Sequence, residues 1–128
     1  MSFTISKPAQ GLYKEKGSKF ISFAFPVTNE DDAKEQIAAI KKKYYDARHH
    51  CYAYVIGDKV RINNDREPSN TAGRPIYGQL LSKNLDHILL IVVRYFGGTK
   101  LGTGGLVQAY KAAATDALSN AEIVSIST

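Results

Sequence analysis

The chain has 128 residues, of which 44% are hydrophobic and 23% are charged, as is typical of one globular domain with a sizeable core. Its net charge of +5 and its pI near 9.3 favour an anionic partner such as RNA or a phosphorylated ligand.

Three classes of protein are excluded by features that the sequence lacks: membrane-spanning proteins, secreted proteins and proteins held by internal disulfides. No apolar run approaches the roughly 18 residues that cross a membrane. The start, Met1–Ile5, has neither the basic nor the long apolar part of a secretory signal. Cys51 is the single cysteine, which excludes an internal disulfide framework and fits a reducing compartment. We therefore expect a cytoplasmic protein with no membrane partner.

The N-terminal part predicts two strands. Residues 3–5 form a short edge strand that Pro8 ends, and residues 14–19 form a charged turn. Residues 20–27 form the second strand, because they are rich in aromatic and β-branched side chains. The face of this strand that we expect to be buried carries Ile21, Phe23 and Phe25.

A helix is expected next. Thr28 or Asn29 caps it, and the acidic residues of its first turn suit the positive end of the helix dipole. The buried stripe recurs at helical spacing and consists of Ala33, Ile37, Ile40 and Tyr44.

Residues 49–57 predict a strand with two unlike faces, because small side chains alternate with His50, Tyr52 and Tyr54. The small face suits a closely packed helix. The aromatic face is either exposed, where tyrosines stack on RNA bases, or half covered, where they pair with neighbouring strands. A tight turn at 57–59 then leads into a hairpin partner.

A polar loop over residues 63–75 follows, and a loop of this length in a compact domain tends to be functional. Pro75 opens a helix that runs to Lys83. Its inward side chains are Ile76, Leu80 and Leu81.

The C-terminal part predicts a buried strand and a long helix. Residues 88–93 are continuously apolar, so this strand is expected to be central in its sheet. The helix runs over 106–121, and its alanines suggest close packing on the sheet. Residues 122–126 form either a short last strand or a linker.

A glycine-rich segment, Arg94–Gly105, joins this strand to the last helix and holds five of the ten glycines. Glycine lets backbone N–H groups face a ligand, and a helix start adds unpaired N–H groups and a positive dipole end. With Arg94 and Lys100, the segment predicts a phosphate or carboxylate site. Its spacing matches neither a Walker loop nor a dinucleotide fingerprint. The alternative is that the glycines only form tight turns and a close helix–strand contact.

The sequence does not predict a metal or another cofactor. His50 and Cys51 are neighbours on a strand and point to opposite faces, and the spacing of a metal site is missing. Cys51 reads as a small buried residue rather than a nucleophile.

Three segments, in this order, resemble motifs of the IMPACT family, in its amino-terminal domain: Asp46–Tyr54, Asp65–Ile76 and Val93–Leu106. The resemblance spans about residues 15–120. It implies an α/β two-layer sandwich, mainly a four-stranded sheet with helices on one face and a left-handed βαβ crossover. Domain four of elongation factor G and the second domain of a small-subunit ribosomal protein have this fold. Bacterial members carry a second, ferredoxin-like domain, and we expect residues 1–128 to form the amino-terminal domain alone.

The resemblance also implies that the three motif loops meet at one end of the sheet. We expect a site there for an anion or a nucleic acid, with no catalytic residue assigned. Its residues are Arg48, His49, Asp65, Glu67, Ser69, Thr71, Arg74, Arg94, Tyr95, Gly97, Gly98, Lys100, Gly102, Gly104 and Gly105.

Three functions fit these features. The first is a non-catalytic binding module that contacts RNA, the ribosome or a translation-associated protein, as eukaryotic members regulate translation initiation. The second is a protein-interaction domain without nucleic acid contact, anchored by Tyr95 and Phe96. The third is an enzyme for a phosphorylated small molecule, in which the glycine segment holds phosphate and Asp65 or Glu67 acts as base or metal ligand.

Overall fold

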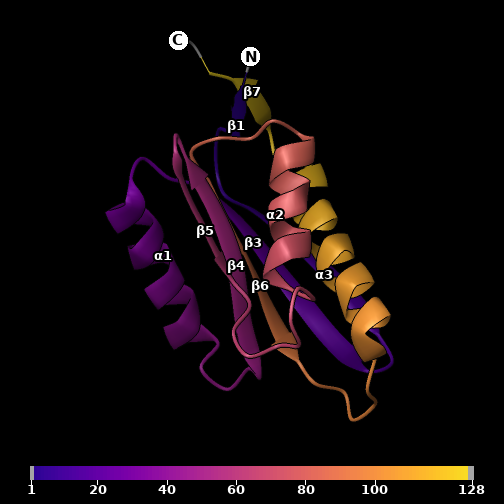
Figure 1. Cartoon of the computed structure of the whole chain (residues 1–128). Coiled ribbons are helices and arrows are strands. Elements are labelled where there is room, and N and C mark those ends of the chain that lie inside the picture. The colour runs from indigo at the N-terminus through magenta and orange to yellow at the C-terminus, as the bar shows by residue number, and fades with distance from the viewer. Residues whose placement is uncertain (1, 127–128) are drawn as a thin grey trace.

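The structure is a computed structural model that describes residues 2–126. Its centre is a five-stranded antiparallel sheet in the order β2-β3-β6-β4-β5. These strands are β2 (Ala9–Glu15), β3 (Ser18–Pro26), β4 (His49–Ile56), β5 (Lys59–Asn63) and β6 (Ile88–Tyr95). Two short strands, β1 (Phe3–Ile5) and β7 (Ile123–Ser125), pair beside the two chain ends (Figure 1).

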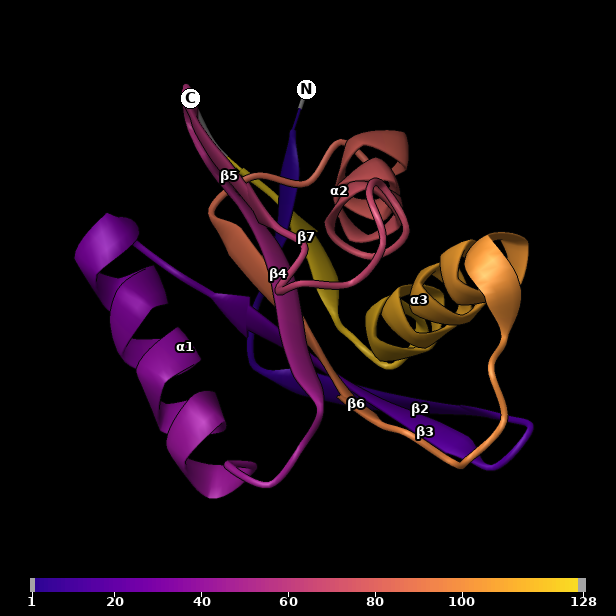
Figure 2. The same ribbon diagram turned by 60° about the horizontal axis from the view of Figure 1, so that its bottom comes forward.

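Helices cover both faces of the sheet. Helix α1 (Glu30–Lys43) lies on one face, and α2 (Gly73–Ser82) and α3 (Gly102–Ser119) lie side by side on the other (Figure 2). The resemblance implied two layers with four strands, and the structure instead has three layers with five strands. The reason is that β4 and β6 carry buried side chains on both faces, so both faces need a cover.

The local patterns that predicted α1 and β6 are confirmed. The Asn29 side chain accepts a hydrogen bond from the Asp32 amide at 2.8 Å and caps α1. The stripe of Ala33, Ile37 and Ile40 is buried. Strand β6 pairs with β3 on one side and β4 on the other, which makes it the central strand.

The two helical crossovers of the sheet have opposite hands. Strands β3 and β4 are parallel, because both pair antiparallel with β6, and α1 connects them on one face. Strands β5 and β6 are parallel for the same reason, and α2 connects them on the other face. Compared with the first connection, the second joins strands of the opposite direction, crosses the sheet the opposite way and lies on the opposite face. Each of these three reversals changes the hand, so the two crossovers have opposite hands. One crossover is therefore left-handed, as the resemblance implied, although nearly all such crossovers are right-handed.

Of the two alternatives for the aromatic face of β4, the exposed one is wrong, and the face of β3 expected to be buried is fully buried only at Phe23. Tyr52 and Tyr54 are buried under α1, and the Tyr54 hydroxyl donates to the Glu30 carboxylate, so neither ring is available to bases. On β3 the fully buried face carries Phe20 and its neighbours at alternate positions, because α3 covers that side. Phe25, on the face expected to be buried, is half exposed beside a hollow of about 580 Å³ next to α1.

One side chain expected to face inward and one element boundary also differ from the prediction. Leu81 is 55% exposed, because α2 buries Ile76 and Leu80 and turns the next side chain outward. Helix α3 begins at Gly102, four residues before the predicted start, so the glycine segment supplies its first turn.

Strand β2 was not predicted, because Pro8, Gly11 and its charged residues read as breaks. It forms because α3 packs against it: the Asp116 carboxylate accepts from the Leu12 amide at 2.8 Å, and Asn120 donates to the Gln10 carbonyl at 2.8 Å. A Cβ atom at Gly11 would lie 2.4 Å from the Ala117 backbone nitrogen. Glycine is therefore required for this close approach.

Gly11→Ala is expected to lower the free energy of unfolding by about 1–3 kcal/mol, because two backbones must separate. The matched control is Gly78→Ala in α2, where an added Cβ meets no atom within 4 Å. That change should raise stability by roughly 0.5–1 kcal/mol. Urea unfolding of both variants tests this, and equal effects would contradict the close β2–α3 contact.

Candidate functional site

Three loops meet at one end of the sheet and enclose a cavity of about 410 Å³. They are the loop before β4, the loop before α2 and the loop between β6 and α3, all at the lower end of the molecule in Figure 1. The cavity is lined by Arg48, His49, Glu67, Pro68, Arg94, Phe96, Lys100, Leu101, Gly102, Thr103 and Leu106. The expected convergence of the motif loops is confirmed, and the volume is within the range of small-ligand sites.

A buried ion pair forms the wall of this cavity. Nη1 of Arg94 lies 3.0 and 2.8 Å from the two carboxylate oxygens of Glu67. Arg94 is 6% exposed and Glu67 is 7% exposed. The guanidinium also lies over the ring of Phe20 and beside that of Phe96, with 5.6 Å to each ring centroid. Charges this well buried are retained only with a partner, so the loop before α2 is fixed to the end of β6.

Helix α3 also bonds to the same carboxylate. The Tyr110 hydroxyl donates to Oε2 of Glu67 at 2.5 Å. Burial raises the pKa of Tyr110, and the nearby Cys51 and Glu67 raise it further, so the phenol keeps its proton and remains a donor. Burial also raises the pKa of Cys51 to about 12, and its thiol donates toward the Tyr110 oxygen at 3.5 Å.

His49 presents a fixed tautomer to this carboxylate. Its Nδ1 lies 2.8 Å from the Asp65 carbonyl oxygen, which only accepts, so the proton is on Nδ1. Nε2 then carries the lone pair in the neutral ring, and it lies 3.4 Å from Oε1 of Glu67. Protonation would turn Nε2 into a donor to that oxygen.

Asn64 organises the loop that carries Glu67. Its side-chain nitrogen donates to the carbonyls of Glu67 and Pro68, and its oxygen accepts from the amides of Ala72 and Gly73 at the start of α2. It therefore caps a helix whose own N-cap residue makes no side-chain bond.

The same loop contains strained backbone. Asp65 and Arg66 have φ angles of 40° and 66°, which residues with a side chain rarely adopt. Strain of this kind often marks a functional site.

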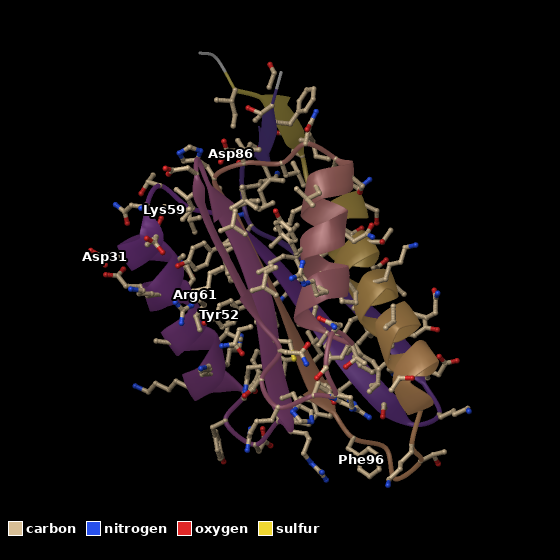
Figure 3. All side chains as sticks on the ribbon, in the orientation of Figure 1. Asp31, Tyr52, Lys59, Arg61, Asp86 and Phe96 are labelled. Atoms are coloured by element: carbon tan, nitrogen blue, oxygen red, sulfur yellow. The ribbon has the colours of Figure 1, made fainter. Side chains whose placement is uncertain are left out.

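The start of α3 contributes uncapped amides. Its N-cap residue, Leu101, makes no side-chain hydrogen bond, and its first turn has no acidic residue. Lys100 is exposed immediately before the helix. Arg48 is exposed across the cavity, and its guanidinium lies 5.1 Å from the ring centroid of Phe96. This rim presents positive charge and one aromatic ring that is 38% exposed (Figure 3).

Nine of the expected site residues do not line the cavity. Some have structural partners: the Thr71 hydroxyl donates to the Pro68 carbonyl, the Tyr95 hydroxyl donates to Asp46, and the Asp65 carboxylate accepts from the His50 amide. The others are Ser69, Arg74, Gly97, Gly98, Gly104 and Gly105.

Gly97 and Arg74 have other surroundings. The Gly97 amide donates to the Ser18 hydroxyl, and the Gly97 backbone packs directly against Gly17. For this glycine the alternative reading, a close backbone contact, is the one observed. Arg74 borders a separate hollow of about 230 Å³.

Residues outside the expected set complete the site. Phe96 was considered only as a protein anchor, and Tyr110 lies in the predicted last helix without an assigned role. Phe96 is recognisable by position because it directly follows the central strand β6, and Tyr110 because it faces that strand from α3. The role of Asn64 had no sequence signal. Pro68, Leu101, Thr103 and Leu106 supply the remaining lining.

Among residues 2–126, no group of three or more His, Cys, Asp or Glu side chains is arranged to hold a metal ion. Over the same residues, no helix combines the length and the apolar character of a membrane span.

A family model described as the Impact N-terminal domain matches residues 16–118, which include all three motif loops. The chain belongs to the IMPACT family. Curated relatives include the IMPACT family member YvyE of Bacillus subtilis, which is 39% identical over 125 residues, and an IMPACT family member of Thermus thermophilus, which is 43% identical over 104 residues. These alignments cover 95% and 81% of this chain but 58% and 56% of the relatives. The IMPACT domain described here thus spans little more than half the length of these relatives.

Solved structures share its fold. A crystal structure of a hypothetical protein is 34% identical, with a TM-score of 0.92 over 96% of this chain and 62% of the other. The two-domain translational regulator Yih1 is 22% identical, with a TM-score of 0.53 over 94% of this chain and 47% of the other.

Glu67→Ala is expected to lower the free energy of unfolding of the IMPACT domain by about 3–5 kcal/mol, because it leaves the buried Arg94 charge without a partner. Glu35→Ala on the exposed face of α1 is the control, with an expected change within about 0.5 kcal/mol. Urea unfolding measures both. A loss below about 1 kcal/mol for Glu67→Ala would contradict the structural role of the pair.

Cys51 is expected to resist thiol reagents in the folded domain, because the thiol is buried and its raised pKa keeps it protonated at neutral and mildly basic pH. With Ellman's reagent near pH 8, labelling should be at least about a hundredfold slower than in guanidinium chloride, where the pKa returns to about 8.5. Equal rates would contradict the burial of the thiol.

Proposed function

We propose that this IMPACT domain is a non-catalytic binding module of the translation machinery, and that its partner at the cavity is RNA. The observation that carries the proposal is the rim of the cavity. Arg48 and Lys100 lie there beside the uncapped start of α3 and the exposed ring of Phe96.

The chemistry of this rim suits a single-stranded nucleic acid. Two flexible cations and helix amides bind backbone phosphates without regard to sequence. An exposed aromatic ring gives one base a stacking surface, and unstacked bases are accessible mainly in single strands. The net charge of +5 adds a general attraction for the phosphate backbone. Base stacking on Tyr52 and Tyr54, which only an exposed face of β4 would allow, has no part in the proposal, because α1 covers both rings.

The relatives support a role in translation in general but no particular partner. Yih1, which has the same fold, is described as a translational regulator, and a role in translation fits a basic domain of this kind. At 22% identity the likeness extends to the fold, so the RNA partner rests on the cavity itself. The proposal concerns this domain, since the bacterial relatives are considerably longer.

One observation favours an enzyme as a second candidate. In its neutral form His49 presents the Nε2 lone pair next to the cavity and beside a buried carboxylate, which is an arrangement suited to accepting a proton from a bound ligand. Turnover of a phosphorylated compound, lost in His49→Gln, would establish this candidate.

Binding of a single-stranded RNA oligonucleotide is expected to weaken steeply with salt, with a logarithmic slope of about −0.7 for each phosphate neutralised. Arg48→Ala and Lys100→Ala should each lower affinity by roughly fivefold to tenfold. Each should also make the slope shallower by about 0.7, the value for one phosphate contact. Fluorescence anisotropy at several salt concentrations measures both quantities.

Lys59→Ala is the matched control, because Lys59 is exposed at the start of β5, at the opposite end of the sheet from Phe96 (Figure 3). It should change affinity little. Binding that is independent of salt, or equally weakened by all three substitutions, would contradict an RNA site at the cavity. Association with ribosomes that survives removal of RNA by nuclease would instead indicate a protein partner.

A further inference from the structure

Arg94 uses only part of its hydrogen-bonding capacity on Glu67. Both carboxylate oxygens lie against one nitrogen, Nη1. Nε is buried and has no hydrogen-bond partner within residues 2–126. In a guanidinium group Nε and Nη2 form one edge, and this edge binds an oxyanion through two parallel hydrogen bonds. Buried donors are nearly always satisfied, so this side chain in the cavity wall points to a bound oxyanion.

The start of α3 borders the same cavity and favours the same chemistry. Gly102 and Thr103 line it, and the N-cap residue Leu101 makes no side-chain hydrogen bond to the helix start. Lys100 adds a flexible cation next to these amides. A helix start alone is weak evidence for a ligand. Here it coincides with a buried arginine that has an unsatisfied donor, and the two features come from opposite ends of the β6–α3 loop.

We infer that the cavity binds the terminal phosphate of a nucleotide, an identification that rests on the proposed RNA-binding function and specifies what that site recognises. The edge of Arg94 formed by Nε and Nη2, Lys100 and the first turn of α3 hold the phosphate. Arg48 and Phe96, at the rim, contact the rest of the nucleotide. The ligand is either the phosphorylated end of an RNA or a free nucleotide, because both carry the same group.

Charge favours a phosphate monoester over the phosphodiester of a continuing strand. Arg48, Arg94 and Lys100 face one carboxylate, that of Glu67, which leaves an excess of about two positive charges before His49 is counted. A terminal phosphate carries about −1.5 to −2 at neutral pH, whereas a backbone phosphodiester carries one negative charge.

Burial favours the same conclusion. Arg94 is 6% exposed, whereas Phe96 and Lys100 stand at the surface. A group that reaches Arg94 must therefore pass the rim. A terminal phosphate is joined to the rest of the ligand on one side only, so it can enter past the rim. A phosphate inside a strand is joined on both sides, so the rim must admit both continuing chains.

The test compares four ligands by fluorescence anisotropy or calorimetry at constant salt: one RNA oligonucleotide with a 5′ phosphate, with a 3′ phosphate and with two hydroxyl ends, and free AMP. We expect at least one phosphorylated end to bind about tenfold or more tightly than the hydroxyl-ended RNA. Equal binding of all three RNAs would overturn the terminal-phosphate inference and leave RNA binding intact. AMP binding without RNA binding would support the inference and overturn the proposed function. If no ligand binds, both fail.

Two variants test whether the preference for a phosphorylated RNA end arises at the cavity. Arg94→Lys keeps a positive charge for Glu67 but removes the guanidinium edge, so the preference for a phosphorylated end should fall about tenfold. Gly104→Asp places a carboxylate in the first turn of α3, where an added Cβ meets no atom within 4 Å. Gly104 lies next to the cavity lining rather than in it, so the added charge should lower the preference severalfold. The melting temperature should stay equal or rise, because an acidic residue suits the helix start.

Gly104→Ala is the control for this second variant and should retain the preference. If Arg94→Lys does not fold, the Gly104 pair still decides the question. A preference that is undiminished in folded Gly104→Asp would overturn the proposed site.

Discussion

The buried ion pair between Arg94 and Glu67 is the interaction on which the site depends. Arg94 comes from the end of the central strand, and Glu67 comes from a loop with little regular structure of its own. Tyr110 of α3 and His49 of β4 contact the same carboxylate. One side chain thus joins three elements and a loop that are far apart in sequence. Removing one charge of such a pair is far more costly than removing an exposed one, so these elements are held together.

This pairing also decides which charges remain for a ligand. Glu67 occupies one nitrogen of Arg94, while Lys100 and Arg48 stay exposed at the rim. The amides of α3 add to the same positive field, since no acidic side chain caps that helix. The strained backbone at Asp65 and Arg66, directly before Glu67 in the chain, is kept by the hydrogen bonds that order its loop. The cationic rim suits binding of an anion, and contact with the buried Nε of Arg94 requires the side chains around it to move.

The sequence predicted what depends on local pattern. Continuous apolar residues placed β6 at the centre of the sheet, and helical spacing with a polar cap located α1. What it missed depends on distant partners. Strand β2 exists because α3 packs on Gly11, and the tyrosines of β4 are buried because α1 covers a face whose cover the sequence left undecided. Of the site, the motif loops were predicted to meet, but the pairing of Arg94 with Glu67 was not, because sequence alone treats each as a free charge.

The central claim is that the unpaired edge of Arg94 and the start of α3 together receive an oxyanion. Nitrogen-15 NMR follows both groups at once, since the Arg94 Nε–H and the amides of Gly102 to Gly105 give separate signals. Titration with a nucleotide that bears a terminal phosphate should shift all of these signals with one common dissociation constant. The account is contradicted if the nucleotide binds and the Arg94 Nε–H signal stays unchanged while signals elsewhere on the domain move.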